Sequence, residues 1–394
     1  MFDEYHFGRF VNQYCARTYL FDIHPPLGKL TLLAVGKLFG YDHTVCAYNA
    51  IQDVYAPTCK YWVLRATAAA FGSLTAPLMY LAVRGFDGGI WAGVLCASFF
   101  IFDNLNLIES RLVLIDSQLI FWCAMSLVVA QRWWRRWRED FRAREEWARL
   151  GGSGEGELVD KEAFLQGAAA AGAPAALVHC AQRMLGATER NLWCLAVGVV
   201  TSCAISIKWT GLATPGMIGM ESFFGFFFQR KRPVPLVDLL KILAVAAVLY
   251  YTWFVIHFAI LTKSGDGDAF MRVEFQRTLF NNTNYDPLAK HPGYLTTFIQ
   301  LNQEMLAANA RIELRHNWES VWWEWPLNLR GLLYYSKDMP GAINRTKVRA
   351  WGAPLLLGAP SLPPSHQRQP PLTHTHTLPP SSARSLCTSW ATPQ

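Results

Sequence analysis

Two clusters of carboxylate and histidine side chains lie near the start of the 394-residue sequence. The first, FDEYHFGRF, contains Asp3, Glu4 and His6, and the second, FDIHPPLGK, contains Asp22 and His24 before a Pro-Pro turn. A positioned carboxylate can accept the proton of a hydroxyl nucleophile. Taken singly, the acidic pair could be a solvated chain start and His24 a loop residue. Two such clusters bracketing one loop favour a polar site.

Metal binding is the other chemistry that these side chains could perform. The spacing of His6, His24 and the carboxylates fits no familiar ligand pattern, and the nine cysteines form no CxxC pair. We therefore expect neither a resident metal nor a cofactor, and leave open whether a divalent ion assists. Cys15, Cys46 and Cys59 could form a disulfide, but one sequence does not reveal the pairing.

Further ionisable residues lie within or beside strongly apolar runs. A charge at the centre of a bilayer costs about 2.5–3.5 kcal/mol on insertion scales, so such residues tend to face a cavity or a polar ligand. Arg65 could bind an anionic headgroup or simply snorkel at a helix end. Glu109 and Arg111 could be site residues or an ordinary ion pair closing a helical hairpin. The remaining two, at the ends of apolar runs, are Asp116 and Lys208.

The elements that must position these residues are membrane helices. The chain is 52% hydrophobic and only 16% charged, with a mean hydropathy of +0.13, which is typical of a polytopic all-α membrane protein. Six candidate spans are 61–83, 90–108, 112–130, 192–207, 209–228 and 236–261. The segment 27–41 is too short to span and carries Lys29 and Lys37, so we expect an amphipathic helix in the membrane interface.

The basic loops predict the orientation of these spans. Seven arginines lie between residues 131 and 149, and QRKRP occupies 229–233. Short loops rich in Arg and Lys face the cytoplasm. Residues 1–60 and everything after 262 are therefore predicted to be lumenal, and the sequons at Asn281 and Asn344 agree with that side. No nucleic-acid partner is expected.

The chain accordingly divides into six predicted parts. Residues 1–60 form a lumenal loop with an interfacial helix, 61–130 three spans, and 131–190 a cytoplasmic basic and Gly/Ala-rich insert, expected to be a flexible linker with a short helix. Residues 191–261 form three more spans, 262–347 a second lumenal segment, and 348–394 a disordered Pro/Ser/Thr-rich tail.

Several segments resemble one known family. FDEYHFGRFVNQYCARTYLFDIHPPLGKLTLLAVGKLFGYD is similar to the first lumenal loop of the protein O-mannosyltransferases. ESRLVLIDSQLIFW, SIKWTGL and TKSGDGDAFMRVEFQRTL resemble later segments of that family, as does FIQLNQEMLAANARIELRHNWESVWWEWPLNLRGLLYY. The resemblance covers about residues 1–130 and 190–336.

This resemblance implies a GT-C glycosyltransferase-like helix bundle in the endoplasmic reticulum membrane. Such an enzyme transfers mannose from dolichyl phosphate mannose to Ser or Thr hydroxyls of secretory polypeptides by an inverting single displacement, and commonly dimerises with a family member. By similarity, Asp3 and Glu4 form the catalytic motif, and Arg65 handles the donor phosphate. The other residues implied in substrate binding are His6, Asp22, His24, Glu109, Arg111, Asp116 and Lys208.

The sequence departs from the family pattern at both ends. The family has a helix before the Asp-Glu motif, and its eukaryotic members usually carry a MIR domain where this chain has only 284–292. The last helices are replaced by the Pro/Ser/Thr tract, so we expect a truncated chain without the MIR domain. Two alternative functions stay open: a catalytically inactive partner subunit, and a membrane transporter, although no inverted repeat of the spans is evident.

Overall fold

The computed structural model describes residues 2–49, 55–149, 175–225 and 234–311, together with two short strands at 332–336 and 347–350. Most of the expected Gly/Ala-rich linker, the Asn344 sequon and nearly all of the expected tail lie outside these residues.

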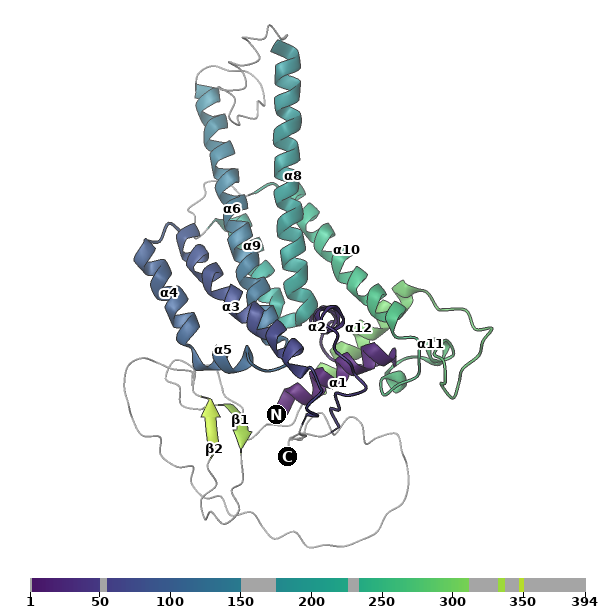
Figure 1. The fold of residues 1–394 in the computed structure, drawn as a ribbon. Coiled ribbons are helices and arrows are strands. Elements are labelled where there is room, and N and C mark those ends of the chain that lie inside the picture. Colours follow the sequence, from purple (N-terminus) through teal and green to yellow (C-terminus); the bar gives the residue numbers. More distant parts are fainter. Residues whose placement is uncertain are drawn as a thin grey trace.

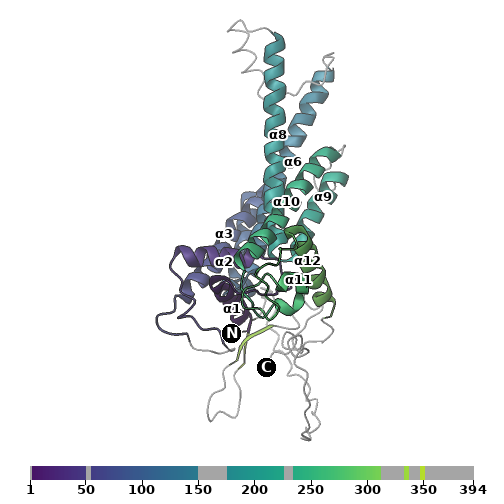
Figure 2. The same ribbon diagram turned by 90° about the vertical axis from the view of Figure 1, so that its right-hand side faces the viewer.

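Long helices form an upright bundle in which neighbours pack in the spatial order α4, α3, α6, α8 and α10 (Figure 1). Their bounds are α3 Tyr61–Gly85, α4 Ile90–Phe102, α6 Asp116–Arg149, α8 Ala175–Ile207 and α10 Leu236–Ile260. The shorter α9, Ala213–Phe224, packs against α6. At one end α6 and α8 project beyond the other helices, as both Figure 1 and Figure 2 show.

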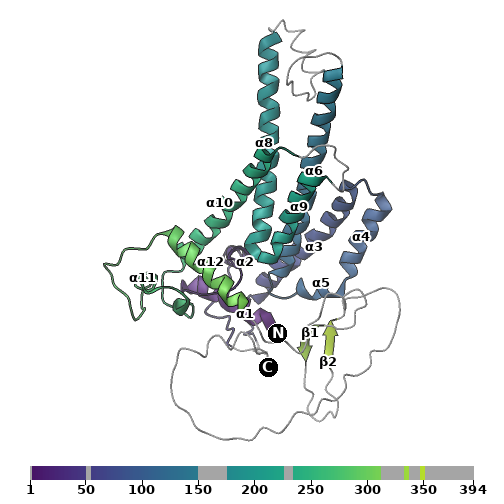
Figure 3. The same cartoon turned by 180° about the vertical axis from the view of Figure 1, so that it is seen from behind.

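Short elements gather at the opposite end of the bundle, which we call the site end (Figure 3). They are α1 Phe2–Ala16, α2 Leu27–Leu38, α5 Asn104–Glu109, the 3-10 turns η1 Trp209–Leu212 and η2 Asp268–Phe270, α11 Val273–Gln276 and α12 Tyr294–Ala310. The largest buried cluster of the described residues lies where α1 and α2 meet α8, α10 and α12, and it is rich in Phe and Tyr. This aromatic core holds the site end against the bundle.

The membrane-protein prediction is confirmed, with corrections to individual spans. Three helical segments of the described residues are long and apolar enough to cross a bilayer, Tyr61–Gly85, Glu189–Ile207 and Leu236–Ile260, and Ile90–Phe102 is a shorter apolar helix. The span predicted at 90–108 is interrupted, because the Asp103 carboxylate accepts a hydrogen bond from the Asn106 N–H (2.8 Å) and begins the separate helix α5.

Two other predicted boundaries also differ. The helix expected to end at residue 130 begins at Asp116 and runs to Arg149, because no Gly or Pro interrupts a stretch rich in Arg and Glu, which favour helix. Its second half therefore extends into the segment expected to be a linker. The span predicted at 209–228 is instead the turn η1 followed by α9, which ends at a left-handed Gly225.

The two strands, β1 Leu332–Ser336 and β2 Lys347–Ala350, form an antiparallel pair. They add a small sheet without changing the helical class, so the all-α prediction holds for the bundle and the site end.

Candidate functional site

Helix α1 carries the Asp3-Glu4 motif in its first turn. Acidic side chains are favoured there, since the N–H groups of the first turn lack helical partners. Glu4, Phe7, Gly8 and Val11 are buried at helical spacing, while Asp3 lies on the open side. The helix thus turns one carboxylate into the protein and leaves its neighbour accessible.

Glu4 joins three separate parts of the fold. Its Oε1 accepts a hydrogen bond from Arg65 Nε (2.6 Å) and its Oε2 one from Arg65 Nη2 (2.7 Å), in a two-point pair with the first turns of α3. The backbone N–H of Val113, in the turn between α5 and α6, also donates to Oε1 (3.3 Å). Because only 1% of Glu4 is exposed, this carboxylate fixes the Arg65 guanidinium in place.

Two tyrosines border Arg65. Its guanidinium carbon lies 4.9 Å from the ring centre of Tyr61 and 5.8 Å from that of Tyr55, and the two rings stack 4.5 Å apart. Such faces attract a guanidinium. An arginine guanidinium is not deprotonated in proteins, so Arg65 carries its charge at any physiological pH.

Asp3 lies near a second ion pair. Lys208, which precedes η1, donates to Asp116 Oδ1 at the start of α6 (2.7 Å). Asp3 is open to solvent, but the protein atoms around it partly desolvate its carboxyl and raise the pKa to about 6. The Lys208 charge opposes this rise, while those of Asp116 and Asp22 add to it. The site therefore brings together residues separated by about 200 positions in the sequence.

The second cluster is organised by a buried lysine. Lys29 in α2 forms an ion pair with Asp22, and its ammonium also donates to the backbone oxygens of His24 (2.8 Å) and Pro25 (3.2 Å). These three acceptors match the three N–H donors of the ammonium group. Lys29 is not a surface residue of its helix, because only 1% of it is exposed; the interfacial position of segment 27–41 stays a prediction.

The protonation states in this cluster follow from burial and from the Lys29 charge. Burial alone would raise the pKa of Asp22, but the neighbouring Lys29 ammonium holds it below its ordinary value. Burial lowers the pKa of His24 to about 4, with Lys208 and Lys29 contributing and Asp22 opposing. His24 is therefore neutral near pH 7, where it can donate one hydrogen bond and accept another.

The GDGDAF loop braces the segment that carries Asp22. A Cβ atom on Gly265 would lie 2.2 Å from the Tyr19 carbonyl oxygen, and one on Gly267 would lie 2.4 Å from the Phe21 nitrogen. Only glycine permits this approach. Tyr19 N–H donates to the Lys263 oxygen (2.7 Å), and Phe21 stacks on Phe270 at 3.8 Å.

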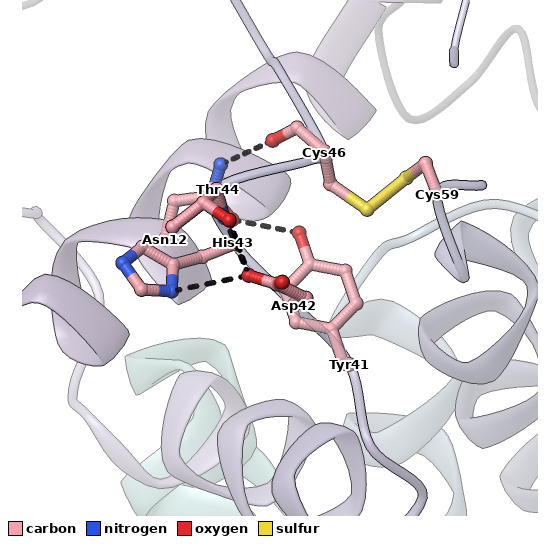
Figure 4. Close-up of a disulfide and its surroundings, with 7 residues drawn as sticks. All are labelled: Asn12, Tyr41, Asp42, His43, Thr44, Cys46 and Cys59. Atoms are coloured by element: carbon pink, nitrogen blue, oxygen red, sulfur yellow. Dashed lines mark hydrogen bonds and ion pairs between the residues drawn. A yellow bond between two sulfur atoms is a disulfide. The ribbon is translucent and has the colours of Figure 1, made fainter.

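A disulfide closes the loop on the other side of α1 (Figure 4). Cys46 bonds to Cys59, and the Cys46 carbonyl accepts a hydrogen bond from Asn12 Nδ2 in α1 (2.6 Å). Tyr41 donates to Asn12 Oδ1 (2.7 Å). The pairing that the sequence left open is therefore Cys46 with Cys59, and the closed loop holds α1 in position.

The structure gathers most, but not all, of the predicted site residues. Charge–charge interactions connect Asp3, Asp22, His24, Asp116 and Lys208. Glu4, which pairs with Arg65 of α3, follows Asp3 in the first turn of α1.

The other three predicted residues take more peripheral positions. His6 is half-buried, and desolvation lowers its pKa. Glu109 ends α5, and Arg111 is exposed in the following turn, which reaches the site through the Val113 N–H.

Sequence reasoning missed Lys29 and His257. The His257 ring in α10 is buried, and its Nδ1 lies 2.7 Å from the Tyr14 hydroxyl. The signal for Lys29 was the acidic residue placed just before the two prolines. His257 gave a weaker signal, a polar residue in an otherwise apolar helix.

Within the part of the chain that the structure describes, no group of three His, Cys, Asp or Glu side chains could hold a metal ion. The arrangement is instead suited to group transfer: an accessible carboxylate with a pKa near 6, beside fixed cationic groups that can bind an anionic leaving group.

Comparisons with known proteins agree with this chemistry. The family model described as dolichyl-phosphate-mannose-protein mannosyltransferase matches residues 1–152, which include α1 to α6. A second model, the C-terminal four TMM region of protein-O-mannosyltransferase, matches residues 294–358.

Individual relatives show the same likeness. Dolichyl-phosphate-mannose–protein mannosyltransferase 4 of Candida albicans is 31% identical over 320 residues, covering 76% of this chain and 35% of the relative. Protein O-mannosyl-transferase 2 of Danio rerio is 28% identical over 304 residues, covering 74% of this chain and 34% of the relative. The chain thus spans about a third of the length of these relatives.

A solved structure is also similar. It is that of the Saccharomyces cerevisiae protein O-mannosyltransferase Pmt1–Pmt2 complex bound to the sugar donor, with a TM-score of 0.54 and 28% identity. The match covers 72% of this chain and 34% of that chain. Two family models, the curated relatives and this structure agree, so the chain belongs to the protein O-mannosyltransferase family.

Proposed function

We propose that this protein transfers mannose from dolichyl phosphate mannose to Ser or Thr hydroxyls of secretory polypeptides. The observation that carries the proposal is the pairing of Glu4 with Arg65 directly beside Asp3. Asp3 and the carboxylate that fixes Arg65 are consecutive residues, so one site contains both a proton acceptor and a fixed cation.

Asp3 is the proposed general base. The acceptor hydroxyl oxygen forms a bond to the anomeric carbon while its proton passes to the Asp3 carboxylate. The bond from that carbon to the phosphate oxygen breaks, and dolichyl phosphate leaves with the electron pair. A single displacement inverts the centre, so a β-linked donor gives an α-mannoside. A pKa of about 6 suits this role, since Asp3 is then mostly ionised at neutral pH and still basic enough to take a proton.

The cations serve the departing phosphate. Negative charge grows on the phosphate oxygens as the bond breaks, so a fixed guanidinium stabilises the transition state more than the ground state. Arg65 is held by Glu4 and needs little reorganisation. Lys208, which interacts electrostatically with Asp3 and is held by Asp116, supplies a second positive group.

A polyprenyl donor also fits the position of the site. Arg65 lies in the second turn of a helix long enough to span a bilayer, so a headgroup bound there keeps its lipid chain in the membrane. The chain also contains the Cys46–Cys59 disulfide, and disulfides form and persist in oxidising compartments. Both observations support a multi-pass protein of the endoplasmic reticulum with this site on the lumenal face.

The proposed assembly is a dimer with another family member. The support is the similar structure, which is a complex of two such proteins bound to the sugar donor. Acceptor choice would then depend on both subunits.

The first test replaces the base. Microsomes containing the full chain and a family partner are supplied with dolichyl phosphate mannose and a Ser/Thr peptide, and mannosyl peptide is measured. Asp3→Asn should lower the rate by about 100-fold or more, the usual range for loss of a general base. Asp42→Asn removes an exposed carboxylate near Cys46 and should keep full activity. Equal rates for Asp3→Asn and the unmodified protein would refute the assignment.

A further inference from the structure

A basic cavity lies between α3 and α6, at the end of the bundle away from Glu4 and Arg65. Its volume is about 300 Å³. The lining residues are Leu81, Arg84, Gly85, Val128, Gln131, Arg132 and Arg135. None of them takes part in the proposed mannosyl transfer.

The floor of this cavity is a close helix–helix contact. A Cβ atom on Gly85 would lie only 2.0 Å from Gln131 Oε1, so the glycine allows the two helices to approach. Gln131 is buried, and its Nε2 donates to the Ala82 carbonyl (2.8 Å). The positions of the arginines on both helices are therefore fixed relative to each other.

The cavity has more positive than negative charge. Its three arginines come from two helices, and Arg135 forms an ion pair with Asp87. The Arg135–Asp87 distance is 3.6 Å and both side chains are about half exposed or more, so this pair is weak. Arg84 donates to the Gly88 carbonyl (2.7 Å), which orients its guanidinium over the turn after α3.

The cavity lies at the depth of a membrane surface. Arg65 and Arg84 are on one continuous helix, and 19 residues of α-helix rise about 28 Å. This matches the roughly 30 Å of a bilayer core. Trp91, near the start of α4, is 82% exposed, and exposed Trp is typical of the membrane–water boundary.

We infer that this cavity binds the phosphate of an anionic glycerophospholipid at the membrane surface opposite the mannosyl-transfer site. Guanidinium groups bind phosphate oxygens in a two-point geometry. Leu81 and Val128 form an apolar wall beside the arginines, where the first methylenes of an acyl chain fit. A soluble phosphate compound would not use that wall, whereas basic pockets between membrane helices suit lipid headgroups.

The test measures lipid retained by the purified full chain. The protein is equilibrated with phosphatidylcholine vesicles containing phosphatidylinositol or phosphatidylserine, and bound lipid is counted by native mass spectrometry. Arg84→Gln combined with Arg132→Gln should lower retention of the anionic lipid about tenfold. Leu81→Trp fills the apolar side without changing charge and should also lower it. Elution as a single species and an unchanged thermal midpoint establish that each variant is folded.

A matched control separates this site from general surface charge. Arg136→Gln combined with Arg190→Gln removes the same charge at the same end of the bundle, from arginines that pair with Glu189 and Asp238 instead. It should keep its lipid. The inference is overturned if this control loses as much lipid, if phosphatidylcholine is retained equally well, or if inorganic phosphate displaces the bound lipid. Mannosyl transfer is measured separately, so failure here leaves the proposed reaction intact.

Discussion

Asp3 and Glu4 are adjacent in sequence, yet the fold gives them different electrostatic roles. Glu4 is buried and bound by Arg65 and the Val113 N–H, so its charge serves to hold a cation. Asp3 faces outward with a pKa of about 6. One helical step of about 100° separates a positioning group from a proton acceptor.

The pH profile of mannosyl transfer should report Asp3. A base acts only when ionised, so kcat/KM should rise with pH through about 6 and level off above it. Lys208 lowers the pKa of Asp3, and Lys208→Gln should therefore move the midpoint to higher pH. The measurement is kcat/KM from about pH 5 to about pH 8 for both proteins. A midpoint that stays in place, or moves to lower pH, would contradict the coupling.

Residue types were predictable from the sequence, and their pairing was not. Asp3 and Glu4 belong to a carboxylate–histidine cluster near the chain start. Arg65, Asp116 and Lys208 are ionisable groups in or beside apolar segments, where membrane energetics disfavours a charge that has no polar partner. Glu4 and Arg65, however, are 61 positions apart, and no local period connects them. Glu109 and Arg111 were interpreted either as site residues or as an ion pair because they are close in sequence; in the structure Glu109 ends α5 and Arg111 is exposed.

At the scale of elements, α2 has an exposed apolar end and a buried charged residue near its start. Leu38 at its end and the following Phe39 are exposed, as expected for a helix at the membrane interface, while Lys29 near its start is buried against Asp22. The hydrophobic pattern predicted the helix and its approximate ends. It did not predict the buried lysine, because Asp22 reaches Lys29 only through the turn at the two prolines.

Breaking the Asp22–Lys29 pair should destabilise the site end. Lys29→Met leaves a buried carboxylate without its partner, at a cost of about 3–5 kcal/mol. The thermal midpoint, followed by tryptophan fluorescence in detergent, should fall clearly.

The double variant Lys29→Met with Asp22→Leu removes both charges and should recover much of the loss. Lys37→Met, at an exposed position of the same helix, is the control and should stay near the original midpoint. An unchanged midpoint for Lys29→Met would show that the buried pair contributes little.

At the scale of the whole molecule, the helix bundle separates two kinds of charge. The site end holds matched carboxylates and cations around Asp3, while the opposite end carries the arginines of α3 and α6 that line the basic cavity. The number of apolar runs and the basic loops were enough to predict this polarity. The projection of α6 and α8 beyond the bundle was not predicted, because the polar halves of both helices lie in the segment interpreted as a cytoplasmic insert.

Glycosylation mapping tests whether these two ends face opposite sides of the membrane. Asn281 is exposed at the site end within the sequon Asn281-Asn282-Thr283, so it should carry a glycan that an endoglycosidase removes and Thr283→Ala abolishes. Gly151→Asn creates a new sequon with Gly152 and Ser153, between α6 and α8. It should stay unmodified, because the basic end is predicted to face the cytoplasm. A glycan at position 151 with none at Asn281 would place Asp3 on the cytoplasmic side, where secretory acceptors are absent, and the proposed transfer would fail.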